Sequence, residues 1–416
     1  MKRMTGGRII TNGSYTFEKI GGKNILLIID PQNDFSDAKE GDRDTGNLSV
    51  IGATEDYRKI IDFIKNNNAS LDEIHVSLDT HTDRHIGHPG FWSRVAENGT
   101  LLTDSDGNLL KTDDKDGLRT LKYVKDNVYE GKSMVMFLPE MFHGDEEIRY
   151  YTPRNYNNDK YDELCNYVKE YINFYYSENN KHGQVPWIWR THCIEDSEGH
   201  KIAKELQDCL ILPDVKNKVR YHIKGQNNLA EMYSIFSAEM PVSQDIMNIL
   251  KDAVYTGKFN NTREFPVTGV SSYDETKTYV NLDTERNTKL MDHLLGFERN
   301  RIGEIINDNM NRIFVCGEAK THCVKSSLID LMEYAGNGVA GDRIVLLANM
   351  TSPIGPKNFP SDNIVRIAGL ENDIREQKLT DKELKSLSMD EINKEKRFRF
   401  TVYDPEDLGA IPTVNK

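Results

Sequence analysis

Short apolar runs that end in a charged residue alternate with helix-like stretches, and this alternation most constrains the fold. Residues 24–30 (NILLIID) and 73–79 (EIHVSLD) are such runs, and we interpret them as buried parallel strands. Four more strands are predicted at 185–193, 219–224, 312–316 and 343–347. Helices are predicted at 53–66, 199–206 and 284–297. Strands that alternate with helices predict an open parallel α/β sheet.

Two polar regions interrupt the alternation. We interpret residues 1–416 as a single domain with insertions at about 94–184 and 260–283 and a C-terminal extension at about 373–416. The first insertion contains two predicted helices, at 118–128 and 161–176. The extension contains a charged helix pattern at 373–394 and an alternating edge strand at 398–403.

Composition excludes several classes of function. The formal net charge of −13 argues against binding to nucleic acids or to anionic membranes, because both need basic patches. No apolar stretch approaches the roughly 20 residues that a membrane helix needs. The chain has 5 cysteines without a CxxC pair, and its polar N-terminus does not resemble a signal peptide. We therefore expect a cytoplasmic protein with free thiols.

Reactive side chains follow the ends of several predicted strands. Parallel α/β sheets bind ligands at the carboxyl ends of their strands. The residues at or just beyond those ends are Asp30, Asp79, His192, Lys224 and Cys323. Their convergence at one edge of one sheet predicts a reactive site there.

Cys323 follows the predicted strand 312–316 and precedes a helix-like stretch at 324–335. Free backbone N–H groups at the start of a helix favour an anion, so we expect a thiolate, which is a nucleophile. The same N–H groups are suited to hold an oxyanion.

Two further residues are candidates for assisting this thiol. Asp30 is placed to act as its general base, although an aspartate before Pro31 is also a common turn residue. Lys224 near the thiol would stabilise a thiolate, although it also fits a solvated surface lysine. Asp34 is better explained as a turn or capping residue.

The segment 79–88 (DTHTDRHIGH) contains two acids and three imidazoles. Asp79 and His81 are two residues apart and share a face if the strand continues. Together with His192 they would form a site for Zn²⁺, Fe²⁺ or Mn²⁺, and His85 and His88 are possible additional ligands. A polar loop without a metal is the alternative.

These motifs together resemble the isochorismatase-like cysteine hydrolases, and within them the nicotinamidase group. The resemblance covers about residues 23–352. It rests on LLIIDPQNDF at 26–35, DTH at 79–81 with His85, WRTHCIEDSEG at 189–199, IKG at 223–225 and GEAKTHCV at 317–324. The motif HIGHPGFW at 85–92 is similar to a longer branch of the family with insertions.

The resemblance implies a three-layer α/β/α sandwich around a parallel sheet. It implies a catalytic base at Asp30, a catalytic lysine at Lys224, a nucleophile at Cys323 and a metal, most typically zinc, at Asp79, His81 and His192. It also implies a cis peptide at Glu318–Ala319 that aims N–H groups, including that of Cys323, at the oxyanion. Phe35 and Trp189 are candidates for packing on a substrate ring, or for ordinary core positions.

The implied activity is hydrolysis of nicotinamide to nicotinate and ammonia through a thioester, a step of NAD salvage. The partners expected are a small amide substrate and other copies of the chain in a homo-oligomer. Another carboxamide or carbamoyl substrate is the first alternative, and a non-catalytic binding protein on the same fold is the second.

Overall fold

The computed structural model describes most of the predicted α/β/α layers and part of the insertions. The described residues are 21–37, 46–95, 160–175, 177–184, 187–251, 284–335, 343–347 and 349–354, with the short strand segments 121–122, 128–129, 132–133, 135–136, 150–153, 279–280 and 401–403.

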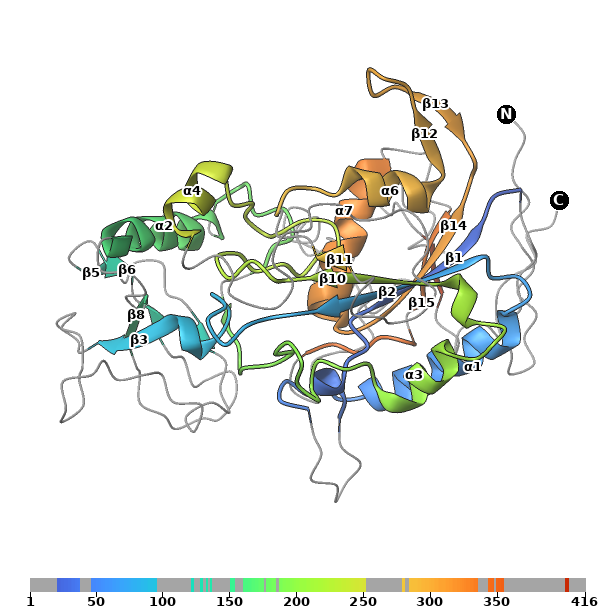
Figure 1. Cartoon of the computed structure of the whole chain (residues 1–416), viewed down its shortest axis with the longest axis horizontal. Coiled ribbons are helices and arrows are strands. Elements are labelled where there is room, and N and C mark those ends of the chain that lie inside the picture. Colours follow the sequence, from blue (N-terminus) through green and yellow to red (C-terminus); the bar gives the residue numbers. More distant parts are fainter. Residues whose placement is uncertain are drawn as a thin grey trace, which may run out of the picture.

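A parallel sheet forms the centre of the molecule (Figure 1). Its strand order is β11-β10-β2-β1-β14-β15-β16, and every neighbouring pair is parallel. The strands are β1 (Asn24–Ile29), β2 (Glu73–Asp79), β10 (Val219–Lys224), β11 (Tyr279–Val280), β14 (Arg312–Gly317), β15 (Ile344–Leu347) and β16 (Thr401–Tyr403). The predicted parallel sheet is confirmed, and so is the edge strand near residue 400.

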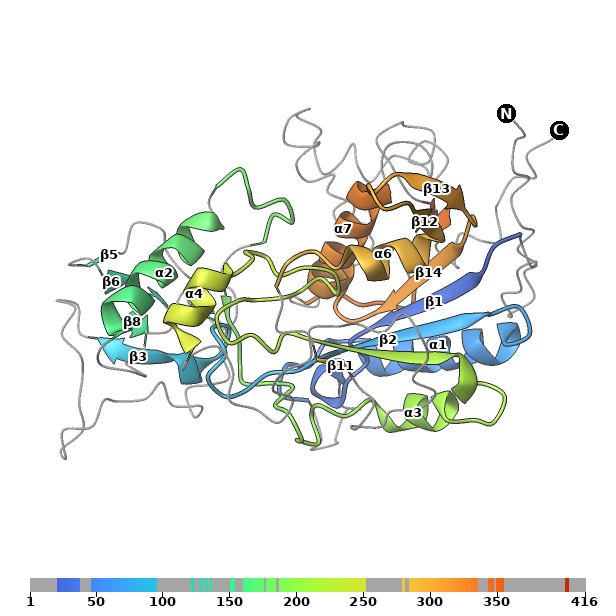
Figure 2. The same cartoon turned by 45° about the horizontal axis from the view of Figure 1, so that its top comes forward.

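Helices cover both faces of this sheet, as Figure 2 shows most clearly. On one face, α1 (Ala53–Asn67) and α3 (Lys204–Leu210) pack in a core that includes Leu26 and Ile28 of β1. On the other face, α6 (Thr288–Leu295) and α7 (Lys325–Ala335) pack with Ile25, Leu27 and Ile29. Both sides of β1 are therefore buried, which explains its continuous apolar sequence. The α/β/α sandwich is confirmed.

A second group of elements lies beyond the carboxyl ends of β2 and β10. The strands β3 (Trp92–Val95), β8 (Tyr150–Pro153), β7 (Val135–Met136), β4 (Leu121–Lys122) and β9 (Trp187–Ile188) form an antiparallel sheet in this order. The helices α2 (Tyr161–Phe174) and α4 (Gln244–Ile249) lie beside it, and β5 (Val128–Tyr129) pairs with β6 (Lys132–Ser133). Trp92, Tyr167 and Tyr171 contribute to a separate apolar core there.

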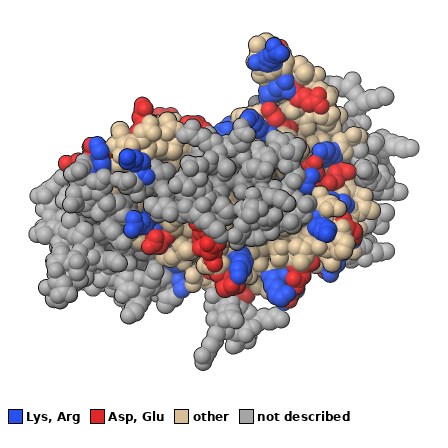
Figure 3. All heavy atoms as spheres, viewed as in Figure 1, with Lys and Arg blue, Asp and Glu red and all other residues tan. Residues whose placement is uncertain are grey.

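A two-stranded hairpin projects from the α6 side of the molecule (Figure 1). It consists of β12 (Phe297–Arg299) and β13 (Ile305–Asp308). On the face shown in Figure 3, the described acidic and basic side chains are interspersed.

Several predicted elements differ from the structure. Residues 185–193 do not form a central strand: only Trp187–Ile188 is a strand, and it pairs antiparallel with β4. The helix predicted at 118–128 is wrong where the chain is described, because residues 121–122 and 128 lie in strands. The helix predicted at 199–206 begins only at Lys204, and the one at 284–297 spans 288–295. The helix at 161–176 is confirmed as α2, and residues 373–394 lie outside the described residues.

All five cysteines are free thiols in the structure. Among the described residues, no helix combines the length and apolar character that crossing a membrane would require.

Candidate functional site

The register of the central sheet brings three charged side chains to one edge. Lys224 pairs directly with Asp79 across β10 and β2, and both are the last residues of their strands. Asp30 follows the last residue of β1, Ile29, which pairs with Gly317 at the end of β14. Cys323 lies six residues beyond Gly317, so the chain reaches the same edge.

The alternation of β2 and β10 decides which face these side chains occupy. Val76 and Leu78 pack in the core beneath α1 and α3, whereas Cys323 belongs to the core beneath α6 and α7. Asp79 and Lys224 therefore point toward the α6 and α7 layer, where the thiol lies.

Lys224 is the centre of the site. Its Nζ lies 2.9 Å from Asp30 Oδ2, 3.1 Å from Asp79 Oδ1 and 3.7 Å from Cys323 Sγ. It also donates a hydrogen bond of 2.9 Å to the carbonyl of Met232. Burial alone would lower the pKa of Lys224, but Asp30, Asp79 and the thiol together raise it well above its usual value. The lysine is therefore a buried ammonium, not a surface charge.

Asp30 is completely buried and is held by a second side chain. Ser77 Oγ donates to Asp30 Oδ1 at 2.6 Å and accepts from the Asp30 backbone N–H at 3.0 Å. The residue has a positive φ of 44°, a conformation that non-glycine residues rarely adopt and that often occurs at functional sites. Burial raises the pKa of Asp30, although Lys224 opposes this shift. A carboxylate with a raised pKa is suited to take up and return a proton.

Cys323 lies in a single π-helical turn, Lys320–Val324, that leads directly into α7. Its side chain is 5% exposed. Burial raises the pKa of the thiol well above its usual value, and Asp30 and Asp79 add to the shift while Lys224 opposes it. Burial, the largest cause of this shift, therefore opposes the thiolate that the helix start alone predicts.

The peptide bond between Glu318 and Ala319 is cis, at the position that the sequence motif indicated. The backbone N–H of Glu318 donates 2.7 Å to the carbonyl of Ile29, which ties this turn to the end of β1. The backbone of the nucleophile loop and that of Asp30 are therefore fixed relative to each other.

Asp79, His81 and His192 converge beside Lys224. Asp79 Oδ2 lies 3.0 Å from His81 Nε2 and 3.8 Å from His192 Nε2. His81 Nδ1 lies 2.8 Å from the carbonyl of Gly225, and His192 Nδ1 lies 2.8 Å from that of Arg190. Each Nδ1 can thus donate to a carbonyl, which leaves both Nε2 lone pairs directed at the Asp79 carboxylate. This is the donor set and the tautomer that a divalent metal requires.

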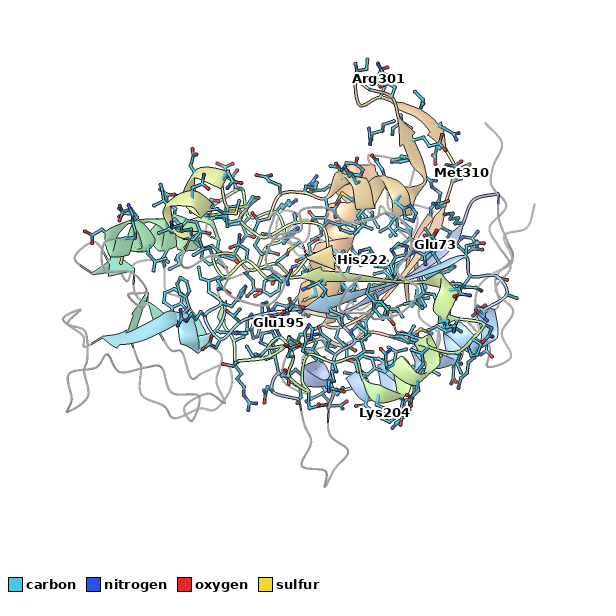
Figure 4. All side chains as sticks on the ribbon, in the orientation of Figure 1. Glu73, Glu195, Lys204, His222, Arg301 and Met310 are labelled. Atoms are coloured by element: carbon cyan, nitrogen blue, oxygen red, sulfur yellow. The ribbon has the colours of Figure 1, made fainter. Side chains whose placement is uncertain are left out.

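His192 reaches this position from a loop, not from the predicted central strand. The backbone around it bridges to the end of β2: the N–H of His81 donates to the carbonyl of Cys193, and that of Glu195 donates to His81. Figure 4 labels Glu195 just beyond the carboxyl end of β2. Asp34 fixes the same loop, because its Oδ2 accepts 2.6 Å from the N–H of Cys193. Its structural role agrees with the sequence interpretation.

His85 and His88 have other partners. His85 Nε2 lies 3.0 Å from the carbonyl of Ala230, and its Nδ1 accepts 3.0 Å from the N–H of Gly87. Both ring nitrogens of His85 thus have protein partners, but His85 with His81 and Glu231, and His88 with His81 and His192, also form groups whose ligand atoms lie within 4.8 Å of one another. His88 Nδ1 lies 3.2 Å from the carbonyl of Thr82, and its Nε2 lies 3.1 Å from His192 Nδ1. His88 therefore orients His192 from behind.

Gly225 is required directly after Lys224. Its φ is +76°, and a Cβ at this position would lie 2.4 Å from Asp79 Oδ1 and 2.7 Å from His81 Cε1. A side chain here would displace two of the converging residues.

The two aromatic candidates lie on different sides of the site. The Phe35 ring contacts the ring of His192 at 5.5 Å between centroids. Trp189 donates 2.9 Å from Nε1 to the hydroxyl of Tyr233, and its ring lies 5.0 Å from that of His322, the neighbour of Cys323. Both are buried, so contact with a ligand remains a prediction.

Sequence reasoning did not assign roles to Ser77, Tyr233 or His322. Residues 73–79 alternate polar and apolar side chains, so Ser77 shares a face with Asp79. That alternation was the available signal for Ser77. Tyr233 begins the segment 233–236 (YSIF), which resembles the family's Tyr-Ser-x-Phe, and His322 lies in GEAKTHCV, but only the fold brings their ring centroids to 5.3 Å from each other.

A buried charge network supports α7 from the side of the insertion. His182 lies between Glu239, at 2.8 Å from Nδ1, and Asp330 of α7, at 3.1 Å from Nε2. Burial alone would lower the pKa of His182, but the two carboxylates raise it to about 9. Lys181 Nζ also contacts Asp330 at 2.5 Å.

This network predicts a pH-dependent contribution to stability. Since the folded-state pKa of His182 is about 9 and the usual value is 6.5, its stabilisation is fully present below pH 6.5 and is lost as the pH rises through 9. The shift corresponds to about 3 kcal/mol. Urea unfolding at pH 6.5 and 9.5 should show this loss in the wild type and a much smaller loss in His182→Gln. Equal pH dependence in both proteins would contradict the assignment.

Comparisons with known proteins give fold likenesses only. No family model matches the sequence, and no curated protein matches it. The yeast nicotinamidase bound to the inhibitor nicotinaldehyde is similar at 14% identity and a TM-score of 0.38, over 86% of this chain and 98% of that chain. An Acinetobacter baumanii nicotinamidase/pyrazinamidase is similar at 12% identity and a TM-score of 0.37, over 93% and 98%. The Pyrococcus horikoshii pyrazinamidase in complex with zinc is similar at 13% identity and a TM-score of 0.31, over 86% and 94%.

Proposed function

We propose that this chain is an isochorismatase-like cysteine amidohydrolase with a divalent metal, and that it hydrolyses nicotinamide to nicotinate and ammonia. The observation that carries the proposal is the position of the Lys224 ammonium, buried within 3.7 Å of the thiol of Cys323 and within 3.1 Å of two carboxylates. A structural role alone does not require a nucleophile, an acid–base group and a buried cation at one sheet edge.

Asp30 takes the proton of the Cys323 thiol as Sγ attacks the carboxamide carbon. The Lys224 ammonium stabilises the negative charge that develops, and backbone N–H groups of Cys323 and Ala319 hold the oxyanion. Protonated Asp30 then gives the proton to the leaving nitrogen, so that ammonia departs and a thioester remains. Asp30 next removes a proton from water, which attacks the thioester, releases the carboxylate and returns the thiol.

Asp79, His81 and His192 would hold the metal, and their fit rests on the two Nε2 atoms directed at one carboxylate. When bound, the metal supplies a Lewis-acidic position for the ring nitrogen and so orients the ring. Zinc suits this donor set, and iron or manganese are alternatives. The protein is further proposed to act in NAD salvage, in the cytoplasm, as a homo-oligomer.

The effect of metal removal on the rate of ammonia release should show whether nicotinamide or another amide is the substrate. We expect chelator-treated protein to release ammonia from nicotinamide at least about 100-fold more slowly, because a misplaced substrate costs rates of this order. Addition of zinc should restore the rate. The measurement is ammonia release over a panel of nicotinamide, aliphatic carboxamides and N-carbamoyl compounds, with and without chelator.

The panel also contains the outcome that would reject the proposal. Faster turnover of a carbamoyl compound than of nicotinamide, with no effect of chelator, would favour the carbamoyl alternative. No turnover of any amide by metal-loaded protein would favour a binding protein. His192→Asn is the matched variant, since it should reproduce the chelator effect without chelator.

A further inference from the structure

A second group of metal-ligand side chains lies at the opposite end of β2. Glu73 and His75 belong to β2, and His293 belongs to α6, which covers this face of the sheet. Glu73 Oε2 lies 3.0 Å from His75 Nε2 and 2.6 Å from His293 Nε2, and the three donor atoms lie within 4.8 Å of one another. Since His75 and Asp79 are four residues apart, this group is about 13 Å from the candidate active site at about 3.3 Å per residue.

A third histidine, His222, contacts the outer nitrogen of His75. His222 Nε2 lies 2.8 Å from His75 Nδ1, and the two rings are stacked with centroids 5.0 Å apart. Figure 4 labels Glu73 and His222 on the neighbouring strands β2 and β10. If His75 donates from Nδ1 to His222, its Nε2 lone pair is directed at Glu73 and His293. A histidine that donates from one nitrogen to a buried acceptor and presents the other is the usual form of a metal ligand.

Burial and charge are compatible with an ion at this position. The side chains of His75, Glu73 and His293 are 2%, 8% and 14% exposed, so the site is enclosed but open to water through His293. Lys23 contacts the other carboxylate oxygen, Glu73 Oε1, at 2.5 Å and fixes the carboxylate. The positive charges of Lys23 and the nearby Arg220 oppose the binding of a cation here.

We propose that Glu73, His75 and His293 bind a divalent cation, with zinc the best match. Two imidazoles and one carboxylate form a zinc donor set that leaves a further position for water. Neighbouring ligand atoms around a tetrahedral zinc lie about 3.3 Å apart, so the 3.0 Å separation would need to open by about 0.3 Å and the 2.6 Å separation by about 0.7 Å. The ion would join α6 to β2 and act as a structural clamp. The proposal does not depend on the amidase activity.

Zinc stoichiometry tests this proposal directly. Full-length protein is stripped with chelator, dialysed against buffered zinc and analysed by mass spectrometry for metal per chain, in the wild type and in a His192→Asn background. We expect His293→Gln to remove one equivalent of zinc in each background. The neighbouring variant Asp292→Asn, on the same helix, should remove none. Zinc should also raise the unfolding temperature of the His192→Asn protein, and His293→Gln should abolish that rise.

A second measurement detects the bound ion by its absorption spectrum. Cobalt added to the stripped His192→Asn protein should produce visible d–d absorption bands of a low-coordinate nitrogen and oxygen site, and zinc should displace them. His222→Asn should weaken zinc binding by about 10–100-fold, as expected for a residue that orients a ligand. Equal zinc content with and without His293→Gln, or the absence of cobalt bands, would overturn the proposal.

Discussion

Replacement of Cys323 by alanine is expected to abolish ammonia release from nicotinamide, with a loss of roughly 10⁴-fold or more, as for other catalytic nucleophiles. The protein should remain folded, because Cys323 is a small buried side chain and alanine is apolar and of similar size. Its removal leaves no new unpaired charge beside Lys224. The measurement is the single-turnover and steady-state release of ammonia, combined with a urea unfolding curve.

Cys209→Ala is the matched control for this variant. Cys209 is also a buried thiol in a helical segment, in α3 on the other face of the sheet, and it should keep full activity. Activity of Cys323→Ala close to that of Cys209→Ala would reject the thioester mechanism. Loss of activity together with loss of the folded state would instead show that the thiol matters for packing, and a Cys323→Ser variant would then test the chemistry in a side chain of similar size.

Replacement of Lys224 by methionine should cause the largest loss of stability. The change leaves Asp30 and Asp79 buried without the ammonium that lies 2.9 and 3.1 Å from them. Removal of one partner of a buried ion pair typically costs about 3–5 kcal/mol of unfolding free energy. Urea unfolding of the metal-loaded protein measures this loss. Lys204→Met, at the surface position labelled in Figure 4, should change stability by less than about 0.5 kcal/mol, because its ion pair with Asp208 is exposed.

A double variant identifies the cause of this loss. If the unpaired carboxylate is responsible, then adding Asp30→Asn to Lys224→Met should recover about 1 kcal/mol or more, since contacting residues couple by about 0.5–3 kcal/mol. An additive or larger loss in the double variant would show that the methionine itself is poorly accommodated. A single-variant loss no greater than that of Lys204→Met would contradict the buried ion-pair network.

Much of the sheet and the main catalytic candidates could be predicted from local sequence. The runs at 24–29, 73–79, 219–224 and 312–317 are continuous or alternating apolar segments bounded by polar residues, and each is a parallel strand in the structure. Because parallel strands end at a common edge, the residues after them were expected to meet. Lys224 and Asp30 do meet, at 2.9 Å.

Other features depended on distant partners and were missed. The aromatic run before His192 has the composition of a strand, but Trp187–Ile188 pairs with β4, and Trp189 donates to Gly87 in the loop after β2 instead of to the central sheet. The state of the Cys323 thiol was predicted from the helix start and from Lys224. Its actual environment includes two carboxylates from β1 and β2, which no local pattern at residue 323 contains.

The sequence by itself determined most strands of the central sheet, the approximate positions of several helices and the identity of the reactive side chains, because periodicity and residue chemistry are local properties. Only the tertiary structure decided which face of β2 each polar residue occupies and which partner it meets. It placed Asp79 beside Lys224 and, four residues earlier, His75 beside His222 and His293 of a different layer. The physical reason is that burial and Coulomb interactions depend on neighbours in space. Those neighbours set the pKa of Cys323 and the direction of each imidazole lone pair.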